Sequence, residues 1–198
     1  MNDPAVREID AADRSRAVSV EVVAFSADPI MRWMYPDPHA YLESFPRFVE
    51  AFGGLAFEQG TAYEAGEFGG VSLWLPVGVH VDPGPLEELF RETLAPSILD
   101  EAFPMLEKMG EYHIEEPHWY LPMIGVDTSQ QGRGLGSALL AHRLRECDEQ
   151  GLPAYLESSN PANVPLYERH GFRVVGEIQS GSSPVAFPML REPLSPGR

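Results

Sequence analysis

The chain has 198 residues, of which 30 are acidic and 14 basic, giving a formal net charge of −16 and a sequence pI near 4.6. A surface of this sign repels phosphate backbones and anionic lipids, so neither nucleic acid nor a membrane is expected as a partner. The length and an apolar fraction of 43% predict one folded domain, and the single cysteine, Cys147, excludes an internal disulfide.

The two ends of the chain carry no targeting or anchoring signal that we recognise. MNDPAVREID lacks the basic and apolar regions of a secretory leader, and no run reaches the ~20 apolar residues that span a bilayer. We therefore expect a cytoplasmic protein, with a single domain over residues 1–192 and a frayed C-terminal tail at 193–198.

Apolar spacing and turn residues define the elements of the first half. In chain order we expect a strand at 5–9, a helix at 11–25, a helix at 39–52 and a hairpin of strands at 61–66 and 70–78. The first helix should end before Pro29, because the residue before proline is biased away from helix. Pro46 lies inside the second helical pattern, so a kink or a restart is expected there.

The second half alternates strands and helices. We expect helices at 84–94 and 97–110, a mostly apolar central strand at 118–126, a helix at 136–151, a strand at 154–158, a short helix at 160–171 and closing strands at 172–178 and 186–191. Gly151 followed by Pro153 is typical of a helix end. The pattern predicts a mixed α/β (α+β) fold.

Three glycines occupy every second position where the helix at 136–151 begins: Gly132, Gly134 and Gly136. The first turn of a helix carries unpaired N–H groups and the positive end of the macrodipole. Glycines remove the Cβ atoms that would keep a phosphate away, so the sequence predicts an anion site. Arg133 and Ser137 can add side-chain donors, and a tight turn without a ligand is the structural alternative.

Two common phosphate-binding loops fit this stretch poorly. A P-loop needs a lysine before its Ser or Thr, whereas Gly136 precedes Ser137. The dinucleotide fingerprint is a near miss, with Glu157 close to the position of a ribose-binding acid. However, that fingerprint normally opens its domain, and only 62 residues follow Gly136. An oxidoreductase with a nucleotide cofactor is therefore kept as a minor alternative.

The motif QGRGLG (131–136) resembles the Gln/Arg-x-x-Gly-x-Gly/Ala signature of the GCN5-related N-acetyltransferase (GNAT) family. WYLPMIGVD resembles the central strand of that family, and NPANVPLYERHGF resembles its Asn-to-Tyr helix followed by Gly-Phe. The resemblance covers residues 117–178 and implies a GNAT-like single domain with a central mixed, mostly antiparallel sheet flanked by helices. AFSADPIMRWMYPD, VSLWLPVG and FPMLR resemble the branch of the family that includes puromycin N-acetyltransferase.

The resemblance implies direct acetyl transfer from acetyl-CoA, as a co-substrate, to an amine in a ternary complex, with no metal. The residues that it places at the coenzyme are Ile124, Gly125, Val126, Gln131, Gly132, Arg133, Gly134, Leu135, Gly136, Ser137, Asn160 and Asn163. The Val126 N–H would stabilise the oxyanion of the tetrahedral intermediate. Either asparagine can instead cap the following helix.

For proton transfer, the resemblance implies Tyr167 as the acid that protonates the departing thiolate, and we choose Glu157 as the base. A phenol near pKa 10 that donates to a thiolate near 8.5 works uphill by ~1.5 units. Each residue has a structural alternative: Tyr167 as a packed core aromatic, and Glu157 as a carboxylate that hydrogen-bonds a neighbouring loop.

The segment EYHIEEPHWY suggests a second arrangement of chemical groups. His113, Glu115, Glu116 and His118 include metal-ligand types, but their spacing is not HExxH and Pro117 interrupts any helical face. A metal site is therefore disfavoured. A water-linked base from Glu116 or His118 stays open.

The acceptor is expected to be a small-molecule amine, held by the first two helices and the region 85–112. Phe25, Trp33 and Tyr41 would supply aromatic surface to that wall. An amine-bearing antibiotic, an amino-nucleoside, a polyamine and a peptide N-terminus all fit the sequence. A non-catalytic acetyl-CoA or coenzyme A sensor on the same fold is the alternative from another functional class. No pattern indicates an oligomeric state.

Overall fold

A central sheet organises residues 4–194, the part of the chain that this computed structural model describes. Within that range the sheet has seven strands in the order β1-β2-β3-β4-β5-β7-β6. The last four residues of the tail expected at 193–198 lie outside the described residues.

Every neighbouring pair in the sheet is antiparallel except β4 and β5, which are parallel. The strands are β1 (Val6–Glu8), β2 (Ala62–Ala65), β3 (Gly70–Leu75), β4 (Trp119–Val126), β5 (Ala154–Ser158), β6 (Arg173–Val174) and β7 (Phe187–Arg191). The mixed, mostly antiparallel sheet expected from the sequence is therefore confirmed. The strand expected at 172–178 is shorter, because after Val174 only an isolated bridge between Ile178 and Ala186 continues the pairing.

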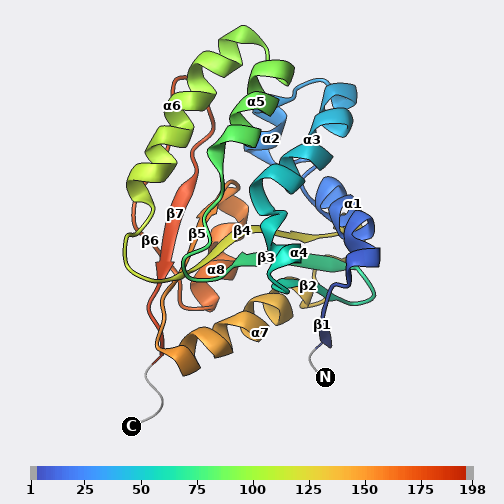
Figure 1. The fold of residues 1–198 in the computed structure, drawn as a ribbon, viewed down its shortest axis with the longest axis vertical. Helices are drawn as coiled ribbons and strands as arrows, with labels where there is room; N and C mark the ends of the chain where they lie inside the picture. The colour runs from blue at the N-terminus through green and yellow to red at the C-terminus, as the bar shows by residue number, and fades with distance from the viewer. Residues whose placement is uncertain (1–3, 195–198) are drawn as a thin grey trace.

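Helices cover both faces of the sheet (Figure 1). They are α1 (Arg14–Ala24), α2 (Pro29–Met34), α3 (Pro38–Gly53), α4 (Leu55–Glu58), α5 (Pro83–Thr93), α6 (Pro96–Tyr112), α7 (Leu135–Gln150) and α8 (Val164–Arg169). The helices α7 and α8 pack on one face through a core that includes Leu139, Leu140 and Phe172. The helices α1 to α6 cover the other face through a larger core. The apolar cavity described below lies in this second layer.

The sequence analysis missed two short helices, α2 and α4, and α2 is the one that borders the site. It begins directly after Asp28, whose carboxylate accepts hydrogen bonds from the N–H groups of Ile30 (3.0 Å) and Met31 (3.1 Å). Pro29 occupies the first helical position, where its missing N–H costs nothing. The Asp-Pro pair is thus a helix start, whereas α1 has already ended at Ala24.

Proline is also tolerated inside a longer helix. Helix α3 continues through Pro46 from Pro38 to Gly53, so the restart expected at Pro46 does not occur. Phe45, Phe48 and Val49 on either side of this proline are buried in the core. Burial of that apolar face offsets the hydrogen bond that the proline cannot donate.

Strands β4 and β5 pair over only two residues and then diverge. Trp119 pairs with Ala154 and Tyr120 with Tyr155, and no further pair follows between these strands in the described chain. A bulge begins in β4 just after Tyr120, where Leu121 and Pro122 of β4 face only Trp74 of β3. Pro122, which has no N–H to give to a ladder, lies in this bulge. The result is a wedge-shaped gap between the two central strands.

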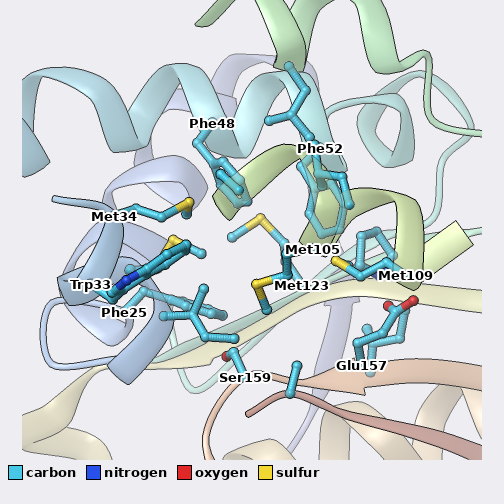
Figure 2. Close-up of a pocket in the computed structure, with 18 of the residues that line it drawn as sticks. Phe25, Trp33, Met34, Phe48, Phe52, Met105, Met109, Met123, Glu157 and Ser159 are labelled. Carbon is cyan, nitrogen blue, oxygen red and sulfur yellow. The ribbon is translucent and has the colours of Figure 1, made fainter. Parts of the chain in front are cut away.

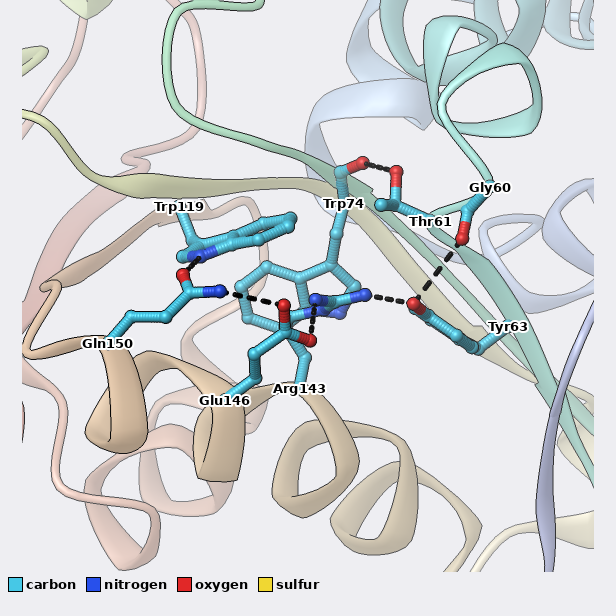
Figure 3. Close-up of polar contacts among 8 residues, drawn as sticks. All are labelled: Gly60, Thr61, Tyr63, Trp74, Trp119, Arg143, Glu146 and Gln150. Atoms are coloured by element: carbon cyan, nitrogen blue, oxygen red, sulfur yellow. Dashed lines mark hydrogen bonds and ion pairs between the residues drawn. The ribbon is translucent and has the colours of Figure 1, made fainter.

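A buried cation ties α7 to the sheet (Figure 3). The Arg143 guanidinium lies 4.1 Å from the ring centroid of Trp119 and 5.0 Å from that of Tyr63, and it bonds the Tyr63 hydroxyl and the Glu146 carboxylate. Gln150 donates to Glu146 (2.8 Å) and accepts from the Trp119 indole N–H (3.0 Å). This network fixes α7 relative to β2 and β4.

Replacing Arg143 with alanine should therefore destabilise the fold. Desolvated cation–π contacts contribute about 2 kcal/mol, and for a chain of this size that loss lowers the melting temperature by roughly 4 to 8 °C. Differential scanning calorimetry measures it. Arg145→Ala, on the exposed side of the same helix, is the matched control and should unfold like the wild type. Equal melting temperatures for the two variants would contradict a stabilising role for Arg143.

Candidate active site

The edge of β4 that faces the gap presents unpaired backbone groups. The Asp127 N–H donates to the carbonyl of Gly69, the residue just before β3 (2.9 Å). Along an antiparallel pair, residues alternate between those whose backbone groups bond the partner strand and those whose groups point away. Gly125 and Met123 therefore turn their backbone groups to β3, whereas Ile124 and Val126 turn theirs to the gap. An extended ligand can add to this edge as a further strand would.

The loop between β4 and α7 needs two of its three glycines for its own geometry. Gly132 (φ 75°) and Gly134 (φ 82°) adopt the left-handed conformation, and Gly134 is the N-cap of α7. Gly136 lies inside the first turn with an ordinary backbone. A Cβ there would meet Leu166 and Val126 only at ordinary contact distances of 3.5 and 3.6 Å. The fold itself therefore does not demand Gly136.

A groove runs from the β4 edge over this loop to α8. Of the residues expected at the coenzyme it contains Ile124, Gly125, Val126, Gln131, Gly132, Gly134, Leu135, Gly136, Ser137, Asn160 and Asn163. Arg133 is not among its lining residues and bonds the side chain of Gln130 instead. Arg169 of α8 lines the groove, and the sequence analysis did not single it out.

Two polar groups of the groove are held by neighbours. The Ser137 hydroxyl hydrogen-bonds Nε2 of His170 (2.6 Å), which links the first turn of α7 to the end of α8. The Asn160 side chain accepts from the Ala162 N–H (3.0 Å) and caps the 3₁₀ turn Pro161–Asn163, as one of the two readings of this residue expected. Asn163 makes no such capping bond.

A second cavity lies on the α2, α3, α5 and α6 side of the gap (Figure 2). The space between its walls is about 910 Å³, including the solvent at its open mouth. Phe25 and Trp33 line it, as expected, together with Phe48, Phe52 and several methionines. Tyr41 does not. It is buried in the core, where it stacks on Phe45 and donates to the Val22 carbonyl (2.7 Å), so this part of the expected wall was wrong.

Glu157 lies at the edge of this cavity. Side chains alternate along β5, so Glu157 and Tyr155 point to the α3 and α6 side while Leu156 points to α7. The Tyr120 hydroxyl donates to the Glu157 carboxylate (2.8 Å). Burial raises the pKa of Glu157 to about 7, against the hydrogen bond from Tyr120, which lowers it. The group is therefore poised between its acid and base forms near neutral pH.

Tyr167 stands where the groove and the cavity meet, and it lines both. It projects from α8 and is 6% exposed. Burial raises its pKa well above the ordinary phenol value, and the negative charges of Asp28 and Glu21 add to the rise. The hydroxyl thus keeps its proton throughout the neutral range and is a hydrogen-bond donor.

The two histidines of the segment 113–118 pair with each other. Nε2 of His113 lies 3.1 Å from Nε2 of His118, whose Nδ1 bonds the Glu116 carbonyl (2.7 Å). Burial lowers the pKa of both rings, that of His113 to about 4. Across residues 4–194, no group of three or more His, Cys, Asp or Glu side chains is placed to hold a metal ion.

Known proteins resemble both the sequence and the fold. Residues 101–172 match the model of the Acetyltransferase (GNAT) family. An uncharacterized N-acetyltransferase of Schizosaccharomyces pombe is 28% identical over 85% of this chain and 74% of its own. A crystal structure from Corynebacterium glutamicum, of the group "histone acetyltransferase HPA2 and related acetyltransferase", has a TM-score of 0.68 and 29% identity over 100% of both chains. The chain thus resembles the GNAT family in sequence over residues 101–172 and in fold over its whole described length.

It is accordingly an acetyltransferase, and acetyl-CoA is the acetyl donor typical of this family. The mycothiol acetyltransferase of Streptomyces coelicolor is 41% identical over 51% of this chain, which spans only 38% of that relative. The resemblance to the branch of puromycin N-acetyltransferase stays a prediction. In the described part of the chain, no helix is both long and apolar enough to cross a membrane.

A carboxyl group without a hydrogen-bond partner lies behind β4, on the side away from the groove's ligand-facing edge. Glu21 of α1 is 0% exposed, and neither of its carboxyl oxygens has a hydrogen-bond partner among the described residues. It packs against Gly125 of β4, where any Cβ would collide with the Glu21 carboxyl and lie 2.7 Å from Ala24. Burial raises the pKa of Glu21 well above its usual value. The residue expected only as a coenzyme contact, Gly125, is thus also required by packing.

The isosteric variant Glu21→Gln should gain stability over the wild type as the pH rises. The folded chain holds the Glu21 proton more tightly than the unfolded chain, so wild-type stability falls once the pH exceeds the unfolded value near 4.5. We expect similar melting temperatures at pH 5 and a higher one for the variant at pH 8. The exposed change Glu149→Gln is the control. A difference that does not grow with pH would show that Glu21 ionises freely.

Proposed function

We propose that this GNAT protein transfers the acetyl group of acetyl-CoA to the primary amine of a small molecule. The observation that carries the proposal is the junction of the two cavities. The groove along β4 and the apolar pocket share Phe25, Ile124, Asn163 and Tyr167. A thioester in the groove and an amine in the pocket would meet at this junction.

The groove residues suit acetyl-CoA. Backbone groups of Ile124 and Val126 that face the gap can pair with the amides of the pantetheine arm. The N–H groups at the start of α7, with Ser137 and Arg169 beside them, suit the pyrophosphate. Gly136, which the fold does not require, leaves open the approach to those N–H groups.

In the reaction that we propose, Glu157 removes a proton from the alkylammonium, directly or through one water. The free amine attacks the thioester carbonyl carbon, and the new oxyanion accepts a hydrogen bond from the Val126 N–H. The C–S bond then breaks, and the sulfur leaves with a proton from Tyr167. Because the pKa of Tyr167 is raised, full transfer to a thiolate is steeply uphill. The Tyr167 proton must therefore pass to the sulfur while the C–S bond breaks. Otherwise Tyr167 must regain a proton from the nitrogen of the attacking amine as it gives its own to the sulfur.

A non-catalytic coenzyme A sensor would need the groove alone. Glu157, with a pKa of about 7, and Tyr167 at the junction favour catalysis over sensing. No feature of the site favours an oxidoreductase. Acetyl transfer is thus the function that the geometry supports best.

The pH dependence tests the role of Glu157. The carboxylate must be ionised to accept a proton, so kcat/KM should rise with pH and level off above an apparent pKa near 7. Glu157→Gln should lower kcat/KM on the order of 100-fold and abolish this limb. A thiol-release assay from pH 5.5 to 9 measures both. An unchanged acidic limb in the variant would assign the base to another group.

Tyr167→Phe separates catalysis from sensing. Loss of the donor should lower kcat on the order of 100-fold or more, with acetyl-CoA binding retained. Thermal stabilisation by acetyl-CoA, coenzyme A and NAD supplies the binding control, since a ligand at 100 times its Kd adds about 2.7 kcal/mol. A variant with wild-type turnover would remove Tyr167 from the mechanism. Stabilisation by NAD alone would overturn the proposed function.

A further inference from the structure

The acceptor pocket contains one acidic side chain and no basic one. Among the described residues that line it, Glu157 is the only Asp, Glu, Lys, Arg or His. Phe25, Phe48, Phe52 and Phe90 form much of the wall. Figure 2 shows Glu157 on one side of the pocket, with Trp33 and Met34 on the opposite side. The pocket is therefore polarised, with a carboxyl group at one side and an apolar remainder.

Methionine is concentrated at this one place. The chain has seven methionines, and five of them line the pocket: Met31, Met34, Met105, Met109 and Met123. They come from α2, α6 and β4, so no single amphipathic helix explains the cluster. Unbranched thioether side chains adapt to ligands of different shapes. Such a wall favours apolar ligands in general rather than ligands of one particular shape.

The neighbouring acidic groups do not serve the pocket. Asp28 caps α2 with one carboxylate oxygen and accepts from the Ser159 hydroxyl (2.6 Å) with the other. Glu21 lies behind Gly125, outside the residues that line the pocket. Glu87 and Glu107 line an adjoining cavity on the other side of Glu157, not the apolar pocket itself. A ligand cation held within the apolar pocket, away from Glu157, would thus find no counter-charge.

We infer that the acceptor is a primary monoamine whose remaining body is apolar, aromatic or branched aliphatic, and that amines with a second positive charge are excluded. The inference rests on the proposed function and deepens it. The single ammonium pairs with the Glu157 carboxylate and gives its proton to it, and the apolar body fills the space among the methionines and phenylalanines. Diamines, polyamines and guanidino-amines would bury an unpaired cation, and a peptide would bury unpaired amide groups.

A matched pair of acceptors tests the charge rule. Hexylamine and 1,6-diaminohexane have the same chain length and differ by the second ammonium; 2-phenylethylamine and agmatine extend the comparison to an aromatic body and a guanidinium. With acetyl-CoA and the wild-type protein, we expect kcat/KM for each monoamine to exceed that of its dicationic counterpart on the order of 100-fold.

The variant Met34→Glu should relax this selection, because it adds a carboxylate on the side of the pocket opposite Glu157. The ratio of diamine to monoamine kcat/KM should rise at least tenfold, whereas the uncharged control Met34→Gln should leave the ratio unchanged. A thermal melt checks whether Met34→Glu folds. If it does not fold, the monoamine-to-diamine ratios of the wild type test the inference on their own.

The outcomes separate the two proposals. Diamines turned over by the wild type as well as the monoamines would overturn the inference and leave amine acetylation standing. Acetyl-CoA binding without transfer to any amine of the panel would overturn the proposed function and the inference with it.

Discussion

The divergence of β4 from β5 is the constraint on which both halves of the site depend. Parallel pairing stops after Tyr120 and Tyr155, and the bulge with Pro122 prevents it from resuming. Backbone groups left unpaired inside a protein are costly, so an open edge between two central strands persists only where something else can satisfy it. The edge at Ile124 and Val126 therefore defines a ligand site before any side chain is considered.

The same divergence distributes the groups that we propose as catalytic. Glu157 stays on β5 and faces the α3 and α6 side, Tyr167 enters from α8, and the glycine loop continues from the end of β4. Their relative positions depend on how α7 and α8 sit on the sheet. The Arg143 network fixes α7 to β2 and β4, and the Ser137–His170 bond joins α7 to α8. Interactions far from the pocket thus set the geometry inside it.

The sequence predicted the parts of this arrangement that are encoded locally. Strand and helix periodicity placed β4, α7 and β5, and the spacing of the glycines marked the loop that lines the groove. Helix α2 was missed because its six residues are too few for a periodic pattern, although Asp28 and Pro29 form a start signal. The methionine wall was also missed. Its members lie on three elements between positions 31 and 123, and only the tertiary fold brings them together.

Burial of acidic groups explains how the selectivity that we infer is compatible with the overall charge of the chain. With a formal net charge of −16, the chain attracts cations in general, including polyamines. The carboxyl groups nearest the site, however, are either engaged, as Asp28 is, or hidden behind β4, as Glu21 is. Among the described residues that line the apolar pocket, only Glu157 is acidic, so attraction at long range is not matched by a second counter-charge inside. On the inference drawn above, surface charge would attract amines of every kind, and the apolar wall would select among them.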